Sequence, residues 1–259
     1  MQDLPTYFLL ALVAAAFVAG FVDSIAGGGG LITIPVLLIA GFPPVAALGT
    51  NKLQGLFGSA SATIAYARGG HVDLRTQGGA ALLSALGAAV GALAATYVPG
   101  ELFGAVLPFL LIAIALYFAL KPNMGDIDRA RRLSPFLFSA TIVPLIGFYD
   151  GLFGPGTVFM LGFVALAGYG MLKATAHTKL LNFASNVGAF IVFAFVGVIA
   201  WKVGLMMGAA QFLGAQAGSR LAMKNGSRII KPLLVITCAA LAIKLMSDPT
   251  HPVRVWIGL

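Results

Sequence analysis

Long apolar runs separated by short polar gaps dominate the sequence. Leu102–Leu120 and Phe183–Ala200 are two examples, each close to the length of a membrane-spanning helix. Strands of an outer-membrane barrel would instead alternate apolar and polar residues over about ten positions. The pattern therefore predicts an all-α, polytopic membrane protein.

Ten membrane elements can be placed along the chain, five in each half. They are predicted at residues 5–22, 31–42, 45–67, 78–98 and 101–120, and then at 134–149, 157–169, 172–199, 203–222 and 229–247. The second element of each half has about 12 residues and would be about 18 Å long. That is too short for a hydrocarbon core of about 30 Å. We therefore expect the first two elements of each half to form a helical hairpin with a glycine-rich tip inside the protein.

The two halves repeat one another. A shift of 127 positions aligns Asp23 with Asp150 and Lys52 with Lys179, together with many glycines and alanines. Paired charges are informative in a chain with so few of them. The predicted organisation is a first membrane repeat at 1–120, a polar linker loop at 121–133 and a second repeat at 134–259. Because five is an odd number, the two repeats are expected to be inverted, as in many secondary transporters.

Composition excludes several classes of protein. Of 259 residues, 59% are hydrophobic and 9% are charged, whereas about a quarter are charged in an average soluble domain. A soluble enzyme and a disordered chain are excluded. The motifs HExxH, CxxC, GxSxG and GxxxxGK[ST] are all missing from the sequence, so we predict neither an enzyme nor a cofactor or metal site.

The formal charge of +8 is interpreted as a topology signal rather than as a nucleic-acid site. With ten elements, one side of the membrane holds Arg68, Arg75, Lys121, Arg129, Arg131, Arg132, Lys173, Arg220, Lys224, Arg228 and Lys231. The positive-inside rule makes this side cytoplasmic. Both termini are then expected outside the cytoplasm, in a bacterial inner membrane.

Glycine-rich breaks follow the first element of each half. The short helices after them are predicted to start near Gly30 and Thr157, where free N–H groups and the helix dipole favour an anion. A tight turn that permits close packing is the alternative. The residues of the two breaks assigned to substrate binding are Gly28, Gly29, Gly30, Gly154, Gly156 and Thr157.

Polar residues also interrupt the third element of each half. Lys52 and Lys179 lie seven to eight residues into otherwise apolar helices, where they either extend to the interface or supply positive charge to an anion. Lys179 shares one helix face with two asparagines, which makes this stripe the better candidate. The substrate-binding residues predicted on these elements are Asn51, Lys52, Lys179, Asn182 and Asn186.

Three titratable residues are candidates for proton coupling: Asp23, Asp150 and His177. A carboxylate in a membrane core is costly enough to suggest function, although hydrogen bonds to the glycine-loop amides would also explain the aspartates. For His177, a hydrogen bond at the helix end is the alternative. Gln211 and Gln216 are interpreted as contacts between helices. Tyr66, Tyr97, Trp201 and Trp256 are interpreted as membrane-interface anchors.

Three short motifs stand out in the sequence: GFVDSIAGGGG at Gly20–Gly30, GTNK at Gly49–Lys52 and GFYDG at Gly147–Gly151. They resemble the TauE/SafE family, the sulfite-exporter-like group of bacterial membrane transporters, and the resemblance extends over essentially the whole chain. It implies a carrier for small sulfur-containing anions such as sulfite, sulfoacetate or related organosulfonates. The second half departs from the first at Pro155 and Thr178, so the two half-sites are not expected to be equivalent.

These observations predict a secondary transporter for a small sulfur-containing anion, coupled to protons and surrounded by lipid. An ion channel, a carrier for non-sulfur carboxylates and a membrane scaffold without transport activity are the alternatives. Two lysines offset two aspartates, so protonation of either aspartate would leave a net positive cavity ready for an anion.

Overall fold

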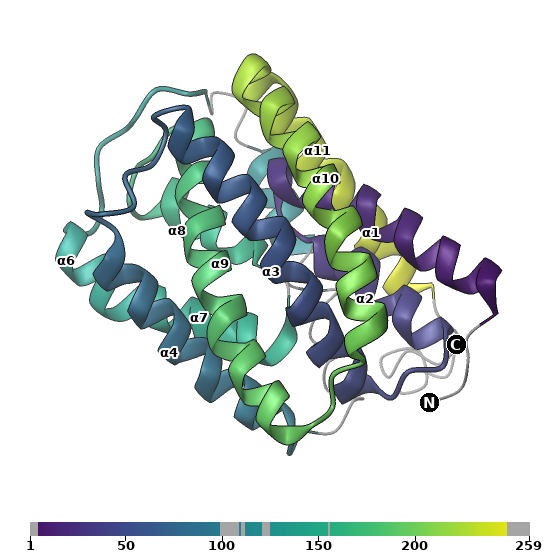
Figure 1. Cartoon of the computed structure of the whole chain (residues 1–259). Helices are drawn as coiled ribbons and strands as arrows, with labels where there is room; N and C mark the ends of the chain where they lie inside the picture. Colours follow the sequence, from purple (N-terminus) through teal and green to yellow (C-terminus); the bar gives the residue numbers. More distant parts are fainter. Residues whose placement is uncertain (1–4, 99–108, 110–111, 121–124, 155, 248–259) are drawn as a thin grey trace.

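The computed structural model describes residues 5–98, 109, 112–120, 125–154 and 156–247, and these residues form no strand. The first half contributes α1 (Thr6–Ala26), α2 (Gly29–Ile39), α3 (Pro44–Arg68) and α4 (Gly78–Ala95). The second half contributes α6 (Pro135–Leu137), a π-helical turn η1 (Phe138–Ile142), α7 (Val143–Phe153), α8 (Thr157–Ala165), α9 (Met171–Val196), α10 (Trp201–Asn225) and α11 (Ser227–Met246). The all-α prediction is confirmed (Figure 1).

Four segments of the described chain are long and apolar enough to cross a membrane. They are α1, α4, the continuous segment Pro135–Phe153 and α9. Helices α3 and α10 are 25 residues long but carry more polar side chains. Half of the element predicted at 101–120 lies outside the described residues, and 112–119 are helical.

Both predicted glycine-rich breaks interrupt the helices. Gly27 and Gly28 have φ angles of 80° and 87°, and Gly154 has a φ of 101°. Side chains with a β-carbon rarely adopt this conformation. The helices that follow are short, with 11 residues in α2 and 9 in α8. The chain can therefore end one helix and begin another within a few residues.

Helices of one half pack mainly against helices of the other. Helix α1 crosses α10 closely, and α4 crosses α7. A β-carbon on Gly214 would lie 2.0 Å from the Phe17 carbonyl oxygen, and one on Gly87 would lie 2.2 Å from the Pro144 carbonyl oxygen. The 127-residue offset relates Gly87 to Gly214 and Phe17 to Pro144, so the two contacts are equivalent in the repeat. Glycine thus permits the same close helix crossing twice, with the halves exchanged.

Helices α3 and α9 pack against each other between these two crossings, and Figure 1 shows them side by side. Helix α3 also contacts α10, and α9 contacts α4. Helices α3 and α9 therefore lie between α10 on one side and α4 on the other. This arrangement buries Lys52, Lys179 and the asparagines of the two helices.

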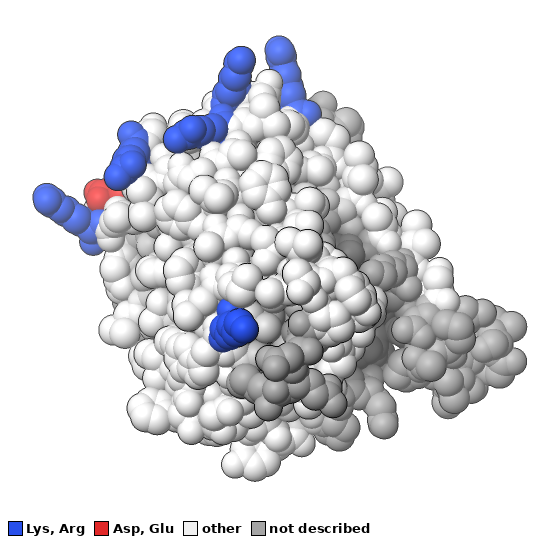
Figure 2. Space-filling view, turned by 45° about the vertical axis from the view of Figure 1, so that its right-hand side comes forward, with Lys and Arg blue, Asp and Glu red and all other residues white. Residues whose placement is uncertain are grey.

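The described part of the linker holds together the ends of several helices. The Asp126 carboxylate accepts hydrogen bonds from the backbone N–H groups of Leu172 and Ser227, at the starts of α9 and α11. Asp128 accepts one from the Gly170 N–H and pairs with Lys173. In Figure 2 most of the visible Lys and Arg side chains gather along one edge of the molecule. This clustering is consistent with the positive-inside prediction, and the inverted orientation of the halves stays a prediction.

One predicted interface anchor is wrong. Tyr66 is fully buried, and its hydroxyl donates a 2.7 Å hydrogen bond to the Ser24 carbonyl oxygen. A polar contact inside the bundle, rather than the membrane surface, therefore satisfies this phenol. Tyr97 and Trp201 are exposed, as expected of anchors. Trp256 lies outside the described residues.

Candidate functional site

Two buried ion pairs connect the halves. The Lys52 Nζ atom lies 3.0 Å from Asp150 Oδ2, and the Lys179 Nζ atom lies 3.0 Å from Asp23 Oδ2. Both lysine side chains are at most 1% exposed, so neither extends to the membrane interface. Each lysine is thus paired with an aspartate of the opposite half.

The helices that carry these groups explain the arrangement. Lys52 and Lys179 lie on the central helices α3 and α9, whereas Asp23 and Asp150 lie in the last turns of α1 and α7, just before the glycine breaks. Removing two charges from water costs several kcal/mol for each ion. Apolar residues of similar volume would often be as stable, so the pairs indicate function more than stability.

Asp23 also holds the start of a helix. Its Oδ1 atom accepts a 3.0 Å hydrogen bond from the Gly29 N–H, the first residue of α2. A β-carbon on Gly29 would lie 2.9 Å from Asp23 Cβ, so glycine permits this approach. The amide that was predicted to bind an anion is therefore already bound to a carboxylate. This is the hydrogen bond to a glycine-loop amide that the sequence left open as an alternative.

Asp150 has different surroundings. Its Oδ2 atom accepts hydrogen bonds from Lys52, from Asn182 Nδ2 at 3.3 Å and from the Ser185 hydroxyl. Its Oδ1 atom is buried and has no hydrogen-bond partner among the described residues. The Lys52 ammonium group that pairs with Asp150 also donates a 3.1 Å hydrogen bond to Asn186 Oδ1. The two aspartates are thus equivalent in the repeat but not in their hydrogen bonds.

A small polar cavity lies beside the ion pairs. Its volume is about 10 Å³, close to the minimum that holds one water molecule. It is lined by a carboxylate, four carboxamides and four glycines: Asp23, Asn51, Asn182, Asn186, Gln211, Gly30, Gly55, Gly154 and Gly156. Seven of these nine residues were predicted from the sequence as site residues.

The tips of the two breaks meet at this site. β-Carbons on Gly27 and Gly28 would lie 3.1 and 3.2 Å from Thr157 Oγ1, and one on Gly30 would lie 3.0 Å from Asn51 Nδ2. The Thr157 hydroxyl is buried and has no hydrogen-bond partner in the described structure. Close packing of glycine backbones therefore brings the start of each short helix to the same place.

His177 stands apart from this site. Its Nδ1 atom lies 2.9 Å from the Lys173 carbonyl oxygen, and its ring contacts those of Phe163 and Tyr169. No contact of His177 with either ion pair is found in the described structure. This geometry matches the alternative of a hydrogen bond near the end of the helix. A role of His177 in proton coupling stays a prediction, and its distance from the ion pairs does not support it.

Sequence reasoning did not assign Gly55 or Gln211 to the site. In the repeat, Gly55 aligns with Asn182 and Gln211 aligns with Ser84. Where one half has Gly55 and the other has Asn182, the first half has space that the second half fills with a carboxamide. Where one half has Ser84 and the other has Gln211, the second half has a larger polar side chain. Both differences were present in the alignment of the halves.

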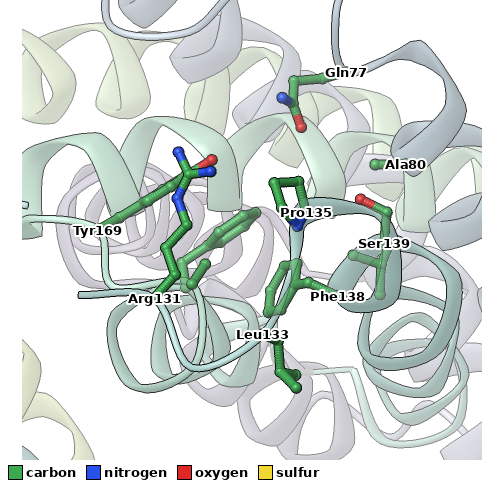
Figure 3. Close-up of a pocket in the computed structure, with 11 residues that line it drawn as sticks. Gln77, Ala80, Arg131, Leu133, Pro135, Phe138, Ser139 and Tyr169 are labelled. Atoms are coloured by element: carbon green, nitrogen blue, oxygen red, sulfur yellow. The ribbon is translucent and has the colours of Figure 1, made fainter. Parts of the chain in front are cut away.

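A second, larger cavity of about 40 Å³ lies where the linker meets the N-terminal end of α4, η1 and α8. Among the described residues, Arg131 is the only charged one that lines it, and Figure 3 shows Arg131 and Tyr169 among the side chains around the cavity. Gln77 and Ser139 supply the other polar side chains around Pro135 and Phe138 (Figure 3). This cavity lies on the side of the linker and shares no lining residue with the ion-pair site.

Comparison with known proteins extends over the whole chain. The family model described as sulfite exporter TauE/SafE matches residues 12–245. The probable membrane transporter protein ORF9 of Sinorhizobium sp is 68% identical over 260 residues, which covers 100% of both chains. The probable membrane transporter protein YfcA of Escherichia coli strain K12 is 44% identical over 252 residues, covering 96% of this chain and 93% of that protein. A probable membrane transporter protein of Haemophilus influenzae is also 44% identical, over 95% of this chain and 98% of its own. No solved structure gives a significant match.

Proposed function

Because the chain belongs to the TauE/SafE sulfite exporter family of membrane transporters, we propose that it is a proton-coupled secondary transporter of a small sulfur-containing anion. The anion would be sulfite or an organosulfonate, and the membrane would be a bacterial inner membrane. The single observation that carries the proposal is the pair of buried Lys–Asp contacts beside a polar cavity.

Charge balance links proton and anion. With all four groups ionised, the two lysines and two aspartates sum to zero. A proton on either aspartate leaves one lysine without a compensating charge, and an anion that enters as the adjacent cavity widens then restores neutrality. An unpaired buried charge is strongly unfavourable, so binding of the proton and binding of a monovalent anion favour each other.

The position of the ion pairs suits alternating access. Each pair connects a helix end of one half to a central helix of the other, so a movement between the halves would change both pairs. In inverted-repeat transporters such movements occur around a site near the middle of the bilayer. The inverted orientation of the halves and the location of both termini outside the cytoplasm belong to this proposal.

Ligand binding is the first measurement. The purified full-length protein in detergent would be heated with sulfite, sulfate, thiosulfate, sulfoacetate, taurine, phosphate or acetate. A ligand at 100 times its Kd stabilises the folded state by about 2.7 kcal/mol, which gives a readable increase in Tm. We expect an increase with a sulfur oxyanion or a sulfonate and its loss in Lys179→Ala. No increase with any anion would overturn the proposed substrate class.

Transport is the second measurement. In proteoliposomes, a carrier gives saturable flux and counterflow, whereas a channel gives ohmic current. An imposed pH gradient is expected to drive uptake of the anion in the native protein but not in Asp150→Asn. Gradient-driven flux at the native rate in folded Asp150→Asn would exclude this aspartate from proton coupling.

A further inference from the structure

Gln211 has a polar atom without a partner at the cavity. The residue lies in α10, is 3% exposed and lines the cavity together with Asp23 and the asparagines. Its Oε1 atom is buried and accepts no hydrogen bond from the described residues. A buried acceptor without a donor costs about 1–3 kcal/mol. An unpartnered carbonyl oxygen on a residue that lines a binding cavity indicates that the ligand supplies the hydrogen-bond donor.

Two glycines make room for this side chain. A β-carbon on Gly58 of α3 would lie 2.7 Å from Gln211 Cγ and 2.8 Å from Nε2. A β-carbon on Gly20 of α1 would lie 2.2 Å from the Gln211 carbonyl oxygen. The backbone of α10 is therefore held against α1, and the carboxamide passes across α3. The Nε2 atom lies toward Gly58, and the Oε1 atom is buried without a hydrogen-bond partner among the described residues.

The other half has no such group. At the position that matches Gln211, Ser84 donates a 2.8 Å hydrogen bond to the Leu181 carbonyl oxygen and is fully satisfied. At the position that matches Gly58, Ser185 donates to Asp150. The repeated scaffold thus carries an additional hydrogen-bond acceptor on one side only, at the cavity. Helix packing does not account for the difference, because Ser84 occupies the equivalent crossing.

The remaining polar groups of the cavity are mainly donors or are already paired. Asn51 Oδ1 accepts hydrogen bonds from Thr33 and Gln54, which turns its Nδ2 donor toward Gly30. Both carboxylate oxygens of Asp23 have partners in Gly29 and Lys179. The cavity therefore offers the Asn51 Nδ2 donor to the oxygens of an anion, and among its described lining residues Gln211 Oε1 is the buried side-chain atom without a hydrogen-bond partner.

We propose that Gln211 determines substrate specificity: its Oε1 atom accepts a hydrogen bond from the bound anion. The cavity then favours an oxyanion that carries an O–H or N–H group over one that carries none. This inference rests on the proposed function and adds the chemistry of the ligand. Sites built around a hydrogen bond reject analogues that lack the matching group, because a buried polar atom is then left unpaired.

Three sulfonates of similar size test the proposal. Kd is measured by calorimetry on the full-length protein in detergent for methanesulfonate, hydroxymethanesulfonate and aminomethanesulfonate. The last two differ in whether the donor is O–H or N–H. The native protein is expected to bind at least one donor-bearing compound about tenfold or more tightly than methanesulfonate. Equal affinity for all three would overturn the proposal.

Variants separate a specific contact from packing. Gln211→Met keeps the length of the side chain but lacks the amide oxygen, so the preference is expected to fall to about one. Gln216→Met is the matched control on the same helix, because Gln216 Nε2 donates to the Ser61 carbonyl oxygen and does not line the cavity. The control is expected to retain the preference of the native protein.

The outcomes separate a failure of the proposed function from a failure of the role proposed for Gln211. If the native protein binds none of these sulfonates and no sulfite, the proposed function fails, and this inference fails with it. If it binds them but Gln211→Met keeps the native preference, only the role of Gln211 is overturned. If Gln211→Met does not fold, Gln211→Asn replaces it, since a shorter carboxamide withdraws the acceptor and is expected to abolish the preference. An unchanged preference in Gln211→Asn would overturn the proposal.

Discussion

Lys52 and Asp150 are separated by 98 residues in the chain, yet their charged atoms lie 3.0 Å apart in a fully buried ion pair. Lys179 and Asp23 repeat this relationship across 156 residues. Each pair joins the two halves, so neither half alone satisfies its own buried charges. The two halves therefore have to assemble on each other for either site to form.

A double-mutant cycle on Lys52 and Asp150 tests this dependence. Lys52→Met or Asp150→Leu alone leaves one buried charge without a partner and is expected to lower the free energy of unfolding by about 3–5 kcal/mol. The double variant removes both charges and is expected to regain most of that loss. Unfolding of the four proteins in detergent, followed by circular dichroism, gives the coupling energy.

The control for this cycle is the Lys173–Asp128 pair, whose side chains are 40% and 46% exposed. Exposed pairs contribute about 1 kcal/mol or less, so Lys173→Met with Asp128→Asn should show little coupling. A coupling energy for Lys52 and Asp150 no larger than that of the exposed pair would show that the two buried charges do not depend on each other.

The sequence predicted the positions of the elements well because hydrophobicity and glycine dictate them locally. The breaks before Gly29 and Thr157 were visible as runs of residues that disfavour helix. The partners of the two lysines were not predicted. Periodicity places Lys52 on a helix but does not say which end of which other helix will face it. Only the assembled crossings α1–α10 and α4–α7 determine that.

The role that we propose for Gln211 was not predicted from the sequence, for a physical reason. A mid-helix glutamine beside glycines is typical of a contact between helices, and Gln216 on the same helix makes such a contact. What separates the two is whether the carboxamide finds a partner, which depends on the neighbouring helices. The asymmetric pairing of Asp23 and Asp150 has the same origin.

The glycine crossings predict a matched pair of effects. Gly214→Ala and Gly87→Ala each place a β-carbon about 2 Å from a backbone oxygen of the crossing helix, which forces the helices apart. Each is expected to lower the free energy of unfolding by about 1–3 kcal/mol.

Gly79→Ala is the control, because nothing lies within 4 Å of its β-carbon. The control should be neutral or stabilise by up to about 1 kcal/mol. A clear loss at only one of the two crossings would show that they are not equivalent.

The linker gives a prediction about pH. Partial burial would raise the pKa of Asp128, but hydrogen bonds from Gly170 and Lys173 and the charges of Lys173 and Arg131 outweigh it and hold the pKa below its ordinary value of 3.8. A carboxyl whose pKa is lower in the folded state stabilises the fold above its unfolded pKa, and the effect is lost as pH falls through the folded pKa.

We therefore expect the Tm of the native protein to exceed that of Asp128→Asn by a small and constant margin from about pH 5 upward. The margin should shrink as the pH falls below 4. Scanning calorimetry of both proteins from pH 3 to pH 8 measures it. A margin that grows toward low pH would have the wrong sign for a carboxylate stabilised by lysine and arginine.

Gly58 controls the space available to Gln211, and this gives a prediction about affinity. In Gly58→Ala the new methyl group would lie 2.7 Å from Gln211 Cγ, so the flexible carboxamide has to move. The cavity is only about 10 Å³ and has to widen to admit a sulfonate, and a carboxamide displaced toward it opposes that widening. We expect weaker binding of the sulfonate preferred by the native protein, with little change in Tm, because a side chain rather than backbone is displaced.

Binding by calorimetry and unfolding by circular dichroism on the same preparation separate the two effects. Native affinity in Gly58→Ala would mean that the carboxamide moves away from the ligand, and the side of the cavity assigned to Gln211 would then be wrong.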